Sequence, residues 1–508
     1  MQHLLPVELR PTRRGPRLRL EHLYLLLALA ACGVLVSLMP TPPNDIWWHL
    51  RIGQLIASEG QIPATNRFAW SLPADAPFVY GAWLGEYLLY QLYALGGWAL
   101  VVFARNLQWL LTLGLLAWAT QMRTGAWRWG AFTAALVTAM SLNNLIVRPQ
   151  NWSWLPFAVM VVVLTRWSLG RGRRWELLGL PLVMAFWVNA HGAWLLGLVL
   201  PAVWTAGETL RTLFRQADAA PRRRLAELYV AGLATLAATL LNPSGWGIYG
   251  YVAKLLTDAP SQRLVEEWQS PTPQGIANIT FFVTILLLLA VFALAQRRPT
   301  LTDVVVSCAF LWLAWSGMRY VVWWGMLAAP ILAQSLTRPT AAPPRRPHRE
   351  SGLFNGVLAV MLLIPVVLAQ PWFVRAVPLG VEYQRTVLAA PAPPLLTVTT
   401  PVAAVEWLRA HPGGRLWNDM GYGSYLIWAM PEQMVFVDTR VELFPLTQWQ
   451  DYSIIRAGYA LPALFTKYGI DRVLLDRAGQ PQLSTALATL PGWRREYQDT
   501  WSEVWREE

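Results

Sequence analysis

Apolar runs of about twenty residues recur along this chain, and they constrain its fold more than any other feature. A helix needs about 20 apolar residues to cross the hydrocarbon core of a bilayer. Runs close to that length lie at 20–40, 98–121, 130–147, 151–168, 175–190, 192–210, 225–242, 276–296, 302–317, 319–336 and 352–370. The chain of 508 residues is 55% apolar and only 14% charged, which argues against a soluble enzyme. The sequence predicts a polytopic α-helical membrane protein with about 11 transmembrane helices.

The basic residues indicate how the chain is oriented. A net charge of +12 can indicate nucleic-acid binding, but here the arginines lie in short loops between apolar runs. That pattern is typical of loops that stay in the cytoplasm, and it argues against a nucleic-acid partner. Several arginines precede the first run: Arg10, Arg13, Arg14, Arg17 and Arg19. We therefore expect residues 1–19 to form a basic cytoplasmic N-terminus of a multi-pass protein surrounded by membrane lipids.

One apolar run, YGAWLGEYLLYQLYALGG (80–97), can be placed in two ways. It is short, carries Glu86 and contains four tyrosines, which favour the headgroup level of a membrane. If this run crossed the membrane, the loops MRTGAWRWG and WSLGRGRRWE would both face outward with their arginines. If it lies in the interface as an amphipathic helix, both loops face the cytoplasm, and we adopt this placement. The transmembrane domain then spans 20–370, with a first outer loop at 41–97.

The remaining loops separate into two kinds. The loops RTLFRQADAAPRRR, AQRRP and TRPTAAPPRRPHRE are basic and fall on the cytoplasmic side. The loops VRPQN, NAHG, NPSGWGIYGY…EEWQSP and GMRY fall on the other side and carry unusual polar residues. Because His, Arg and Asn near membrane depth are costly, they tend to line cavities. We expect a functional site on the extracytoplasmic face.

The residue pattern changes after 370. Short β-like runs (RLWND, MVFVDTR, RVLLD and EYQDTWSEVW) alternate with helical stretches around 400–410, 422–429, 447–457, 460–468 and 481–490. This alternation predicts a small soluble α/β domain over 371–508, which the span count places outside the membrane as an accessory domain. Within FVDTRVE, the residues Asp438, Arg440 and Glu442 can either bind a ligand or form a structural salt bridge.

Candidate site residues gather in the outward loops. Asp45 directly follows the first apolar run, where a carboxylate can act as a base towards a hydroxyl. His49 shares a face with Asp45 if this stretch is helical, and arginines provide the charge and the directional donors that phosphate needs. The predicted substrate-binding residues are His49, Arg51, Glu86, Arg148, Asn189, His191, Glu267 and Arg319.

Two further features leave alternatives open. Trp47, Trp48 and Trp83 can stack on a sugar or simply anchor the chain at the membrane interface. Asp45 is also a candidate ligand for a divalent metal, Mg²⁺ or Mn²⁺, although no zinc motif such as HExxH is present. We expect no other cofactor.

The stretch NDIWWHLRIGQLIASEGQIPATNRFAW, followed by YGAWLGEYLLYQLY, resembles the first outer loop of the GT-C superfamily of glycosyltransferases. That superfamily includes oligosaccharyltransferase catalytic subunits, protein O-mannosyltransferases and aminoarabinose transferases. With RPQ, WVNAHG, NPSGWGIY, EEWQSP, MRY and GYGSYLIW…VFVDTR, most of the chain is similar to a group of bacterial membrane proteins of that superfamily. The resemblance gives Asp45 the place of the catalytic or metal-binding acid.

The resemblance implies an inverting membrane glycosyltransferase of the bacterial cell membrane. Such an enzyme transfers a sugar from a polyprenyl-phosphate-linked donor to a glycan, lipid or protein acceptor on the extracytoplasmic face. The WWD-type acceptor motif of oligosaccharyltransferases is missing, and LWND at 416–419 is the nearest approach, so transfer to an Asn sequon is not expected. A transporter or flippase of a lipid-linked or polar substrate is an alternative, although the sequence has no inverted repeat. A non-catalytic membrane scaffold is a second alternative function.

Overall fold

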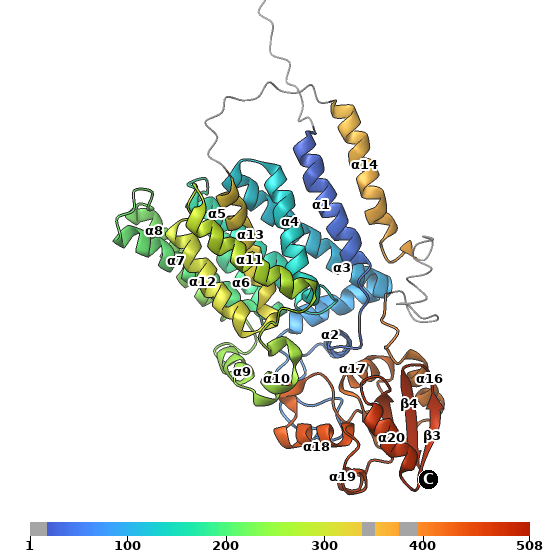
Figure 1. Cartoon of the computed structure of the whole chain (residues 1–508). Helices are drawn as coiled ribbons and strands as arrows, with labels where there is room; N and C mark the ends of the chain where they lie inside the picture. The colour runs from blue at the N-terminus through green and yellow to red at the C-terminus, as the bar shows by residue number, and fades with distance from the viewer. Residues whose placement is uncertain (1–17, 338–350, 375–394) are drawn as a thin grey trace, which may run out of the picture.

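The protein consists of a helical bundle with a small α/β domain at one end (Figure 1). The computed structural model describes residues 18–337, 351–374 and 395–508, so most of the basic N-terminus and of the loop TRPTAAPPRRPHRE lies outside the described residues. The bundle helices are α1 (Leu20–Ser37), α3 (Trp83–Thr124), α4 (Trp127–Ser141), α5 (Asn151–Ser168), α6 (Gly179–Ala190), α7 (Trp194–Leu213), α8 (Arg222–Ala238), α11 (Gly275–Leu294), α12 (Leu301–Ser316), α13 (Val321–Leu336) and α14 (Gly352–Leu368). Each apolar run of the sequence therefore contains a helix.

The length and composition of these helices indicate a membrane protein. Among the described residues, three helices (α1, α3 and α11) are long and apolar enough to cross a membrane, and α12 and α14 are shorter apolar helices. The outer surface is apolar as well: Leu294 of α11 and Leu353 of α14 are each 82% exposed. An apolar outer face on a bundle with an apolar interior is typical of contact with lipid. The count of about 11 transmembrane helices stays a prediction.

Helix α3 has two parts that differ in direction (Figure 1). The backbone leaves helical geometry at Gly96 and at Gly97, whose φ of 63° and ψ of −162° favour glycine. The first part corresponds to the run for which we expect an interfacial helix, and the second part contains the expected span. The bend is compatible with that expectation.

Short elements connect the bundle helices on the side of the α/β domain. They are α2 (Ile46–Glu59), α9 (Gly247–Leu256), α10 (Ala259–Leu264) and the 3-10 turns η1 (Leu142–Asn144), η3 (Glu266–Trp268) and η4 (Met318–Tyr320). A further turn, η2 (Arg174–Leu178), precedes α6. Figure 1 shows α2, α9 and α10 between the bundle and the C-terminal domain.

The C-terminal domain contains the small α/β fold that the sequence predicts. Its sheet has the order β1-β2-β4-β3, with β1 (Leu416–Asn418) parallel to β2 (Arg472–Asp476), while β4 (Ser502–Glu507) is antiparallel to both β2 and β3 (Trp493–Gln498). Its helices are α16 (Val402–Ala410), α17 (Met420–Ala429), α18 (Leu446–Arg456), α19 (Leu461–Tyr468) and α20 (Pro481–Thr489), with a 3-10 turn η6 (Val441–Leu443).

The segment MVFVDTR is not a strand of this sheet, so that prediction is wrong. Val435 instead forms an isolated bridge with Ala69 of the first loop (residues 41–97). The Asn418 side chain accepts a hydrogen bond from the Phe436 amide and donates one to the Val437 carbonyl, each at 2.8 Å. The backbone groups of this segment are therefore satisfied by a loop and a side chain instead of by a strand partner. The predicted single strand EYQDTWSEVW is also divided, because it contains the turn between β3 and β4.

The first loop and the C-terminal domain share one hydrophobic core. Buried side chains of both parts, among them Trp48, Phe78, Phe436 and Val437, belong to the same cluster. Backbone hydrogen bonds reinforce this contact, since the Trp70 amide donates to the Val435 carbonyl at 3.0 Å. The loop that carries Asp45 is thus held by the C-terminal domain as well as by the bundle.

Candidate functional site

Asp45 lies at the start of α2, in the short segment PTPPND that follows the first bundle helix. It occupies the N-cap position, but its side chain forms no capping hydrogen bond. Its Oδ1 atom instead accepts a hydrogen bond from Nε of Arg148 at 2.9 Å. The carboxylate is therefore directed away from its own helix and remains partly exposed.

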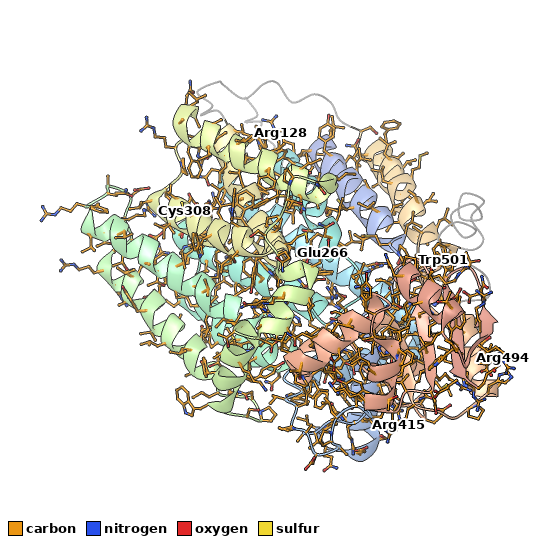
Figure 2. The ribbon with its side chains drawn as sticks, turned by 60° about the horizontal axis from the view of Figure 1, so that its bottom comes forward. Arg128, Glu266, Cys308, Arg415, Arg494 and Trp501 are labelled. Atoms are coloured by element: carbon orange, nitrogen blue, oxygen red, sulfur yellow. The ribbon has the colours of Figure 1, made fainter. Side chains whose placement is uncertain are left out.

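Arg148 joins two carboxylates that are far apart in the sequence. It lies in the loop before α5, and its Nη1 donates to Oε1 of Glu267 in the turn η3. Figure 2 shows Glu266, the neighbour of Glu267, where the bundle meets the C-terminal domain. Burial alone would lower the pKa of Arg148, but the charges of the two carboxylates outweigh burial and raise its pKa. We refer to Asp45, Arg148 and Glu267 as the acid–arginine cluster.

A close approach of α2 and α3 positions the second polar pair of the site. A Cβ atom on Gly53 would overlap the backbone oxygen of Glu86, so the two helices touch at this point. His49 lies one turn before Gly53, and its Nδ1 is 2.7 Å from Oε1 of Glu86. The sequence places His49 and Glu86 at the site separately, and the helix contact makes them a pair.

Burial disfavours the charged forms of both His49 and Glu86. Burial lowers the pKa of His49 and raises the pKa of Glu86, and their mutual attraction only partly offsets this. His49 contacts one carboxyl oxygen of Glu86, and the other oxygen is buried and has no hydrogen-bond partner among the described residues.

His191 belongs to a hydrogen-bond network that fixes its tautomer. The Trp187 indole, which can only donate, bonds to Oγ of Ser153 at 2.8 Å. The Ser153 hydroxyl is 2.9 Å from Nδ1 of His191 and donates to it, as does the Ala193 amide at 3.2 Å. Because Nδ1 accepts both bonds, we assign the ring proton to Nε2. Burial, followed by the charge of Arg319, lowers the pKa of His191 well below its usual value, so this residue is a neutral donor.

Arg319 lies close to the turn that carries Glu267. Its guanidinium stacks over the ring of Trp268 with 4.5 Å to the centroid. Its charge is the second cause, after burial, of the lowered pKa of His191. Arg319 thus adds a second positive charge beside the acid–arginine cluster.

Two predicted residues, Asn189 and Arg51, bind partners outside the acid–arginine cluster. The Asn189 side chain accepts from the Trp83 indole at 2.8 Å and donates to the Leu241 carbonyl at 2.7 Å, which ties α3 and α6 to the end of α8. Arg51 donates to Gln54 in the next turn of α2. These contacts indicate a structural role for Asn189 and do not join Arg51 to Asp45.

The residues in FVDTRVE divide between two roles. Asp438 and Arg440 form a fully buried ion pair at 2.7 Å, and Arg440 also donates to the Tyr80 hydroxyl of the first loop at 3.0 Å. The structural alternative therefore holds for these two residues. Glu442 lies 3.4 Å from the hydroxyl of Tyr251 in α9, so it faces the loops instead of the domain interior.

Sequence reasoning missed two of these contacts. Ser153 lies in an apolar helix, and nothing in its local pattern distinguishes it from a core residue. Tyr251 lies in a loop that the sequence marks as polar, but its partner Glu442 comes from another domain. The contacts of Ser153 and Tyr251 can be identified only from the three-dimensional structure.

The described side chains of the candidate site do not form a recognisable metal site. Among the described residues, no group of three or more His, Cys, Asp or Glu side chains can hold a metal ion. The carboxylates of Asp45 and Glu267 both bind the guanidinium of Arg148. Hard cations such as Mg²⁺ require about six oxygen ligands. The metal-ligand role of Asp45 therefore stays a prediction.

Comparison with known proteins identifies the fold. No family model and no curated protein matches the sequence. The oligosaccharyltransferase AglB from Archaeoglobus fulgidus is similar in structure, with a TM-score of 0.52, 12% identity, and coverage of 96% of this chain and 74% of that chain. ArnT from Cupriavidus metallidurans has a TM-score of 0.51 and 17% identity, covering 95% of this chain and 97% of that chain.

A third structure extends the comparison. The arabinofuranosyltransferase AftD from Mycobacteria matches with a TM-score of 0.51 and 16% identity over 95% of this chain and 40% of that chain. The AglB structure holds an inhibitory peptide and a dolichol-phosphate, and the ArnT structure holds undecaprenyl phosphate. The resemblance to the GT-C superfamily is therefore confirmed at the level of the fold.

Proposed function

We propose that this membrane protein of GT-C fold is a glycosyltransferase that moves a sugar from a polyprenyl-phosphate-linked donor to an acceptor at the extracytoplasmic membrane surface. The observation that carries the proposal is the contact of Asp45 with Arg148 directly after the first helix. Support also comes from structures of the same fold that hold dolichol-phosphate or undecaprenyl phosphate. A donor of this kind needs no nucleotide, which agrees with a sequence that has no Gly-rich phosphate loop.

Asp45 acts as the general base in this proposal. The acceptor hydroxyl transfers its proton to the Asp45 carboxylate while its oxygen attacks the anomeric carbon of the donor sugar. The bond between that carbon and the phosphate oxygen breaks, and its electron pair leaves with the lipid phosphate. Because attack and departure occur on opposite faces of the sugar in one displacement, the anomeric centre inverts.

Arg148, Arg319 and His191 hold the departing phosphate. Arg148 uses Nε and Nη1 for its two carboxylates, and Nη2 is the remaining nitrogen of its guanidinium. Arg319 contributes a second positive charge, and His191 offers a neutral Nε2–H donor. Charge-assisted donors of this kind bind the phosphate of the donor and hold it as it departs. Glu267 keeps Arg148 in place when Asp45 takes up the proton.

The experiment that tests this function measures transfer and translocation separately. The purified protein is reconstituted into liposomes with undecaprenyl phosphate that carries radiolabelled mannose, glucose or arabinose, and a bacterial envelope fraction serves as acceptor. We expect label in the acceptor fraction together with an equal amount of free undecaprenyl phosphate. Label that crosses the bilayer while it stays attached to the lipid would identify a flippase instead, and no movement at all would favour a scaffold.

A further inference from the structure

A cavity of about 200 Å³ lies where α2 and the first part of α3 meet α16 and α17 of the C-terminal domain. Aromatic residues form most of its wall: Trp47, Tyr93, Trp98, Tyr425 and Trp428. Trp47 follows Asp45 by two residues, and positions two apart on a helix face different directions. The cavity is therefore separate from the acid–arginine cluster, although α2 contributes to both.

The rings of this cavity are held rigidly against one another. Trp47 stacks on Trp98 with centroids 4.7 Å apart, and Tyr425 meets Trp47 edge-on at 5.1 Å. Tyr93 and Trp428 form a further edge-to-face pair at 4.9 Å. Because Trp47, Trp98 and Tyr425 are buried, their ring positions are fixed before any ligand arrives.

Polar groups accompany the rings. Glu406 and Arg409 lie three residues apart on α16, and both line the cavity and are exposed. Arg409 is held in place because its Nη2 donates to the Ala429 carbonyl. The indole N–H of Trp98 is buried and has no hydrogen-bond partner among the described residues, which leaves a donor unsatisfied in the cavity wall.

We propose that this cavity binds one ring of a saccharide. A sugar ring presents an apolar C–H face that packs on an aromatic ring, and hydroxyl groups that bond to a carboxylate and a guanidinium. The carboxylate of Glu406 disfavours a phosphate, and burying the charged groups against an acyl chain would be costly. The volume is smaller than the roughly 300–1,000 Å³ of typical drug-sized sites, so it suits a single ring.

This binding site goes beyond the proposed transfer reaction, because none of its residues needs to take part in chemistry. The bound ring can belong to an acceptor glycan or to the sugar of a lipid-linked donor, which share the same recognition chemistry. Binding of free saccharides and competition by lipid-linked saccharides distinguish these two sources.

The test measures saccharide binding by the full-length protein in lipid nanodiscs. An array of immobilised monosaccharides and short oligosaccharides identifies the best binder, whose dissociation constant is then titrated. We expect Trp428→Ala and Glu406→Gln each to raise this constant by about tenfold, from the loss of ring contact and of a charge-assisted hydrogen bond. Trp246→Ala and Glu432→Gln change exposed residues that do not line the cavity and should leave the constant unchanged.

Asp45→Asn should abolish transfer but keep this binding, so failure of the proposed enzyme and failure of this site are distinguishable. If Trp428→Ala does not fold, Glu406→Gln still tests the saccharide site, because a substitution at the exposed Glu406 should leave the fold intact. Absence of binding to every saccharide, or equal affinity of the Glu406→Gln protein, would overturn the proposal. Full displacement of the saccharide by undecaprenyl phosphate without a sugar would identify a lipid site instead.

Discussion

The hydrogen-bond partners of Asp45 and His191 determine which of their polar atoms can meet a substrate. An Asp at the start of a helix usually accepts hydrogen bonds from the backbone amides of the first turn. Asp45 forms no such bond, and its carboxylate faces Arg148 instead. His191 differs, because its Nδ1 accepts hydrogen bonds from Ser153 and from the nearby Ala193 amide, which leaves Nε2 for a ligand.

Arg319 should affect the binding of donor more than the chemical step. We expect Arg319→Ala to raise the KM for the lipid-linked donor about tenfold, with kcat little changed, because a charge-assisted bond to the phosphate is lost in ground state and transition state alike. Initial rates at several donor concentrations provide the measurement. Arg263→Ala, at an exposed position on the neighbouring α10, is the control and should behave as wild type. An unchanged KM in Arg319→Ala would remove Arg319 from the phosphate site.

His191 should make the stability of the protein depend on pH. Its pKa in the folded protein is lowered, by burial first, so it stays neutral where the unfolded chain takes up a proton below about pH 6.5. Its contribution is constant above that pH, and stability is lost by about 1.4 kcal/mol per pH unit as the pH falls further. We expect the melting temperature of the wild type to fall more between pH 7.5 and 5.5 than that of His191→Asn. Equal losses in both proteins would contradict the assignment.

The candidate site could be predicted from the sequence only in part. Polar residues near membrane depth are conspicuous, which is why Asp45, Arg148 and Glu267 could be singled out before their contacts were known. Their pairing could not be predicted, because nothing local says which carboxylate reaches which arginine. Ser153 gave no signal at all, and Arg51 was conspicuous although it only bonds within its own helix.

At the scale of elements, the close approach of two helices holds the site together. Gly53→Ala places a Cβ atom against the backbone oxygen of Glu86, so α2 must move away from α3 and the bond between His49 and Glu86 must lengthen. We expect a lower melting temperature and at least a tenfold loss of transfer, since small displacements of site residues are costly. Gly114→Ala on the same α3 meets nothing within 4 Å and should be neutral or stabilising. Equal behaviour of the two variants would mean that the helix contact is not needed.

The elements themselves were predictable to different degrees. Each apolar run of the sequence contains a bundle helix, although several of these helices, such as α4 and α6, are shorter than a membrane span requires. The segment MVFVDTR reads as a strand because of its β-branched and aromatic residues, but its partners are the first loop and the Asn418 side chain. A contact between two segments that are distant in the sequence cannot be predicted from the strand preference of either segment.

At the scale of the whole molecule, one end of the bundle carries the polar loops, the first loop and the C-terminal domain. The buried pair of Asp438 and Arg440 together with Tyr80 fastens the C-terminal domain to the first loop. That domain therefore supports the segment that carries Asp45. The cavity under α16 lies at the same junction.

The orientation of the chain can be tested with reporters that are active on only one side of the membrane. From the distribution of arginines, we expect reporters fused at residues 125 and 215 to report the cytoplasm, and a reporter at 508 to report the outside. A cytoplasmic signal at 508 would mean that 80–97 crosses the membrane or that another helix does not.

In the proposed mechanism, the Asp45 carboxylate removes a proton from the acceptor during sugar transfer. The most direct measurement compares the rate of label transfer and of undecaprenyl phosphate release for wild type and Asp45→Asn, with and without a chelator. Asp75→Asn, an exposed residue of the same loop, is the matched control. We predict a loss of about 10²–10⁴ in kcat for Asp45→Asn, with little change in the KM for donor and full activity for the control. An Asp45→Asn protein that is folded and turns over at the wild-type rate would contradict this account.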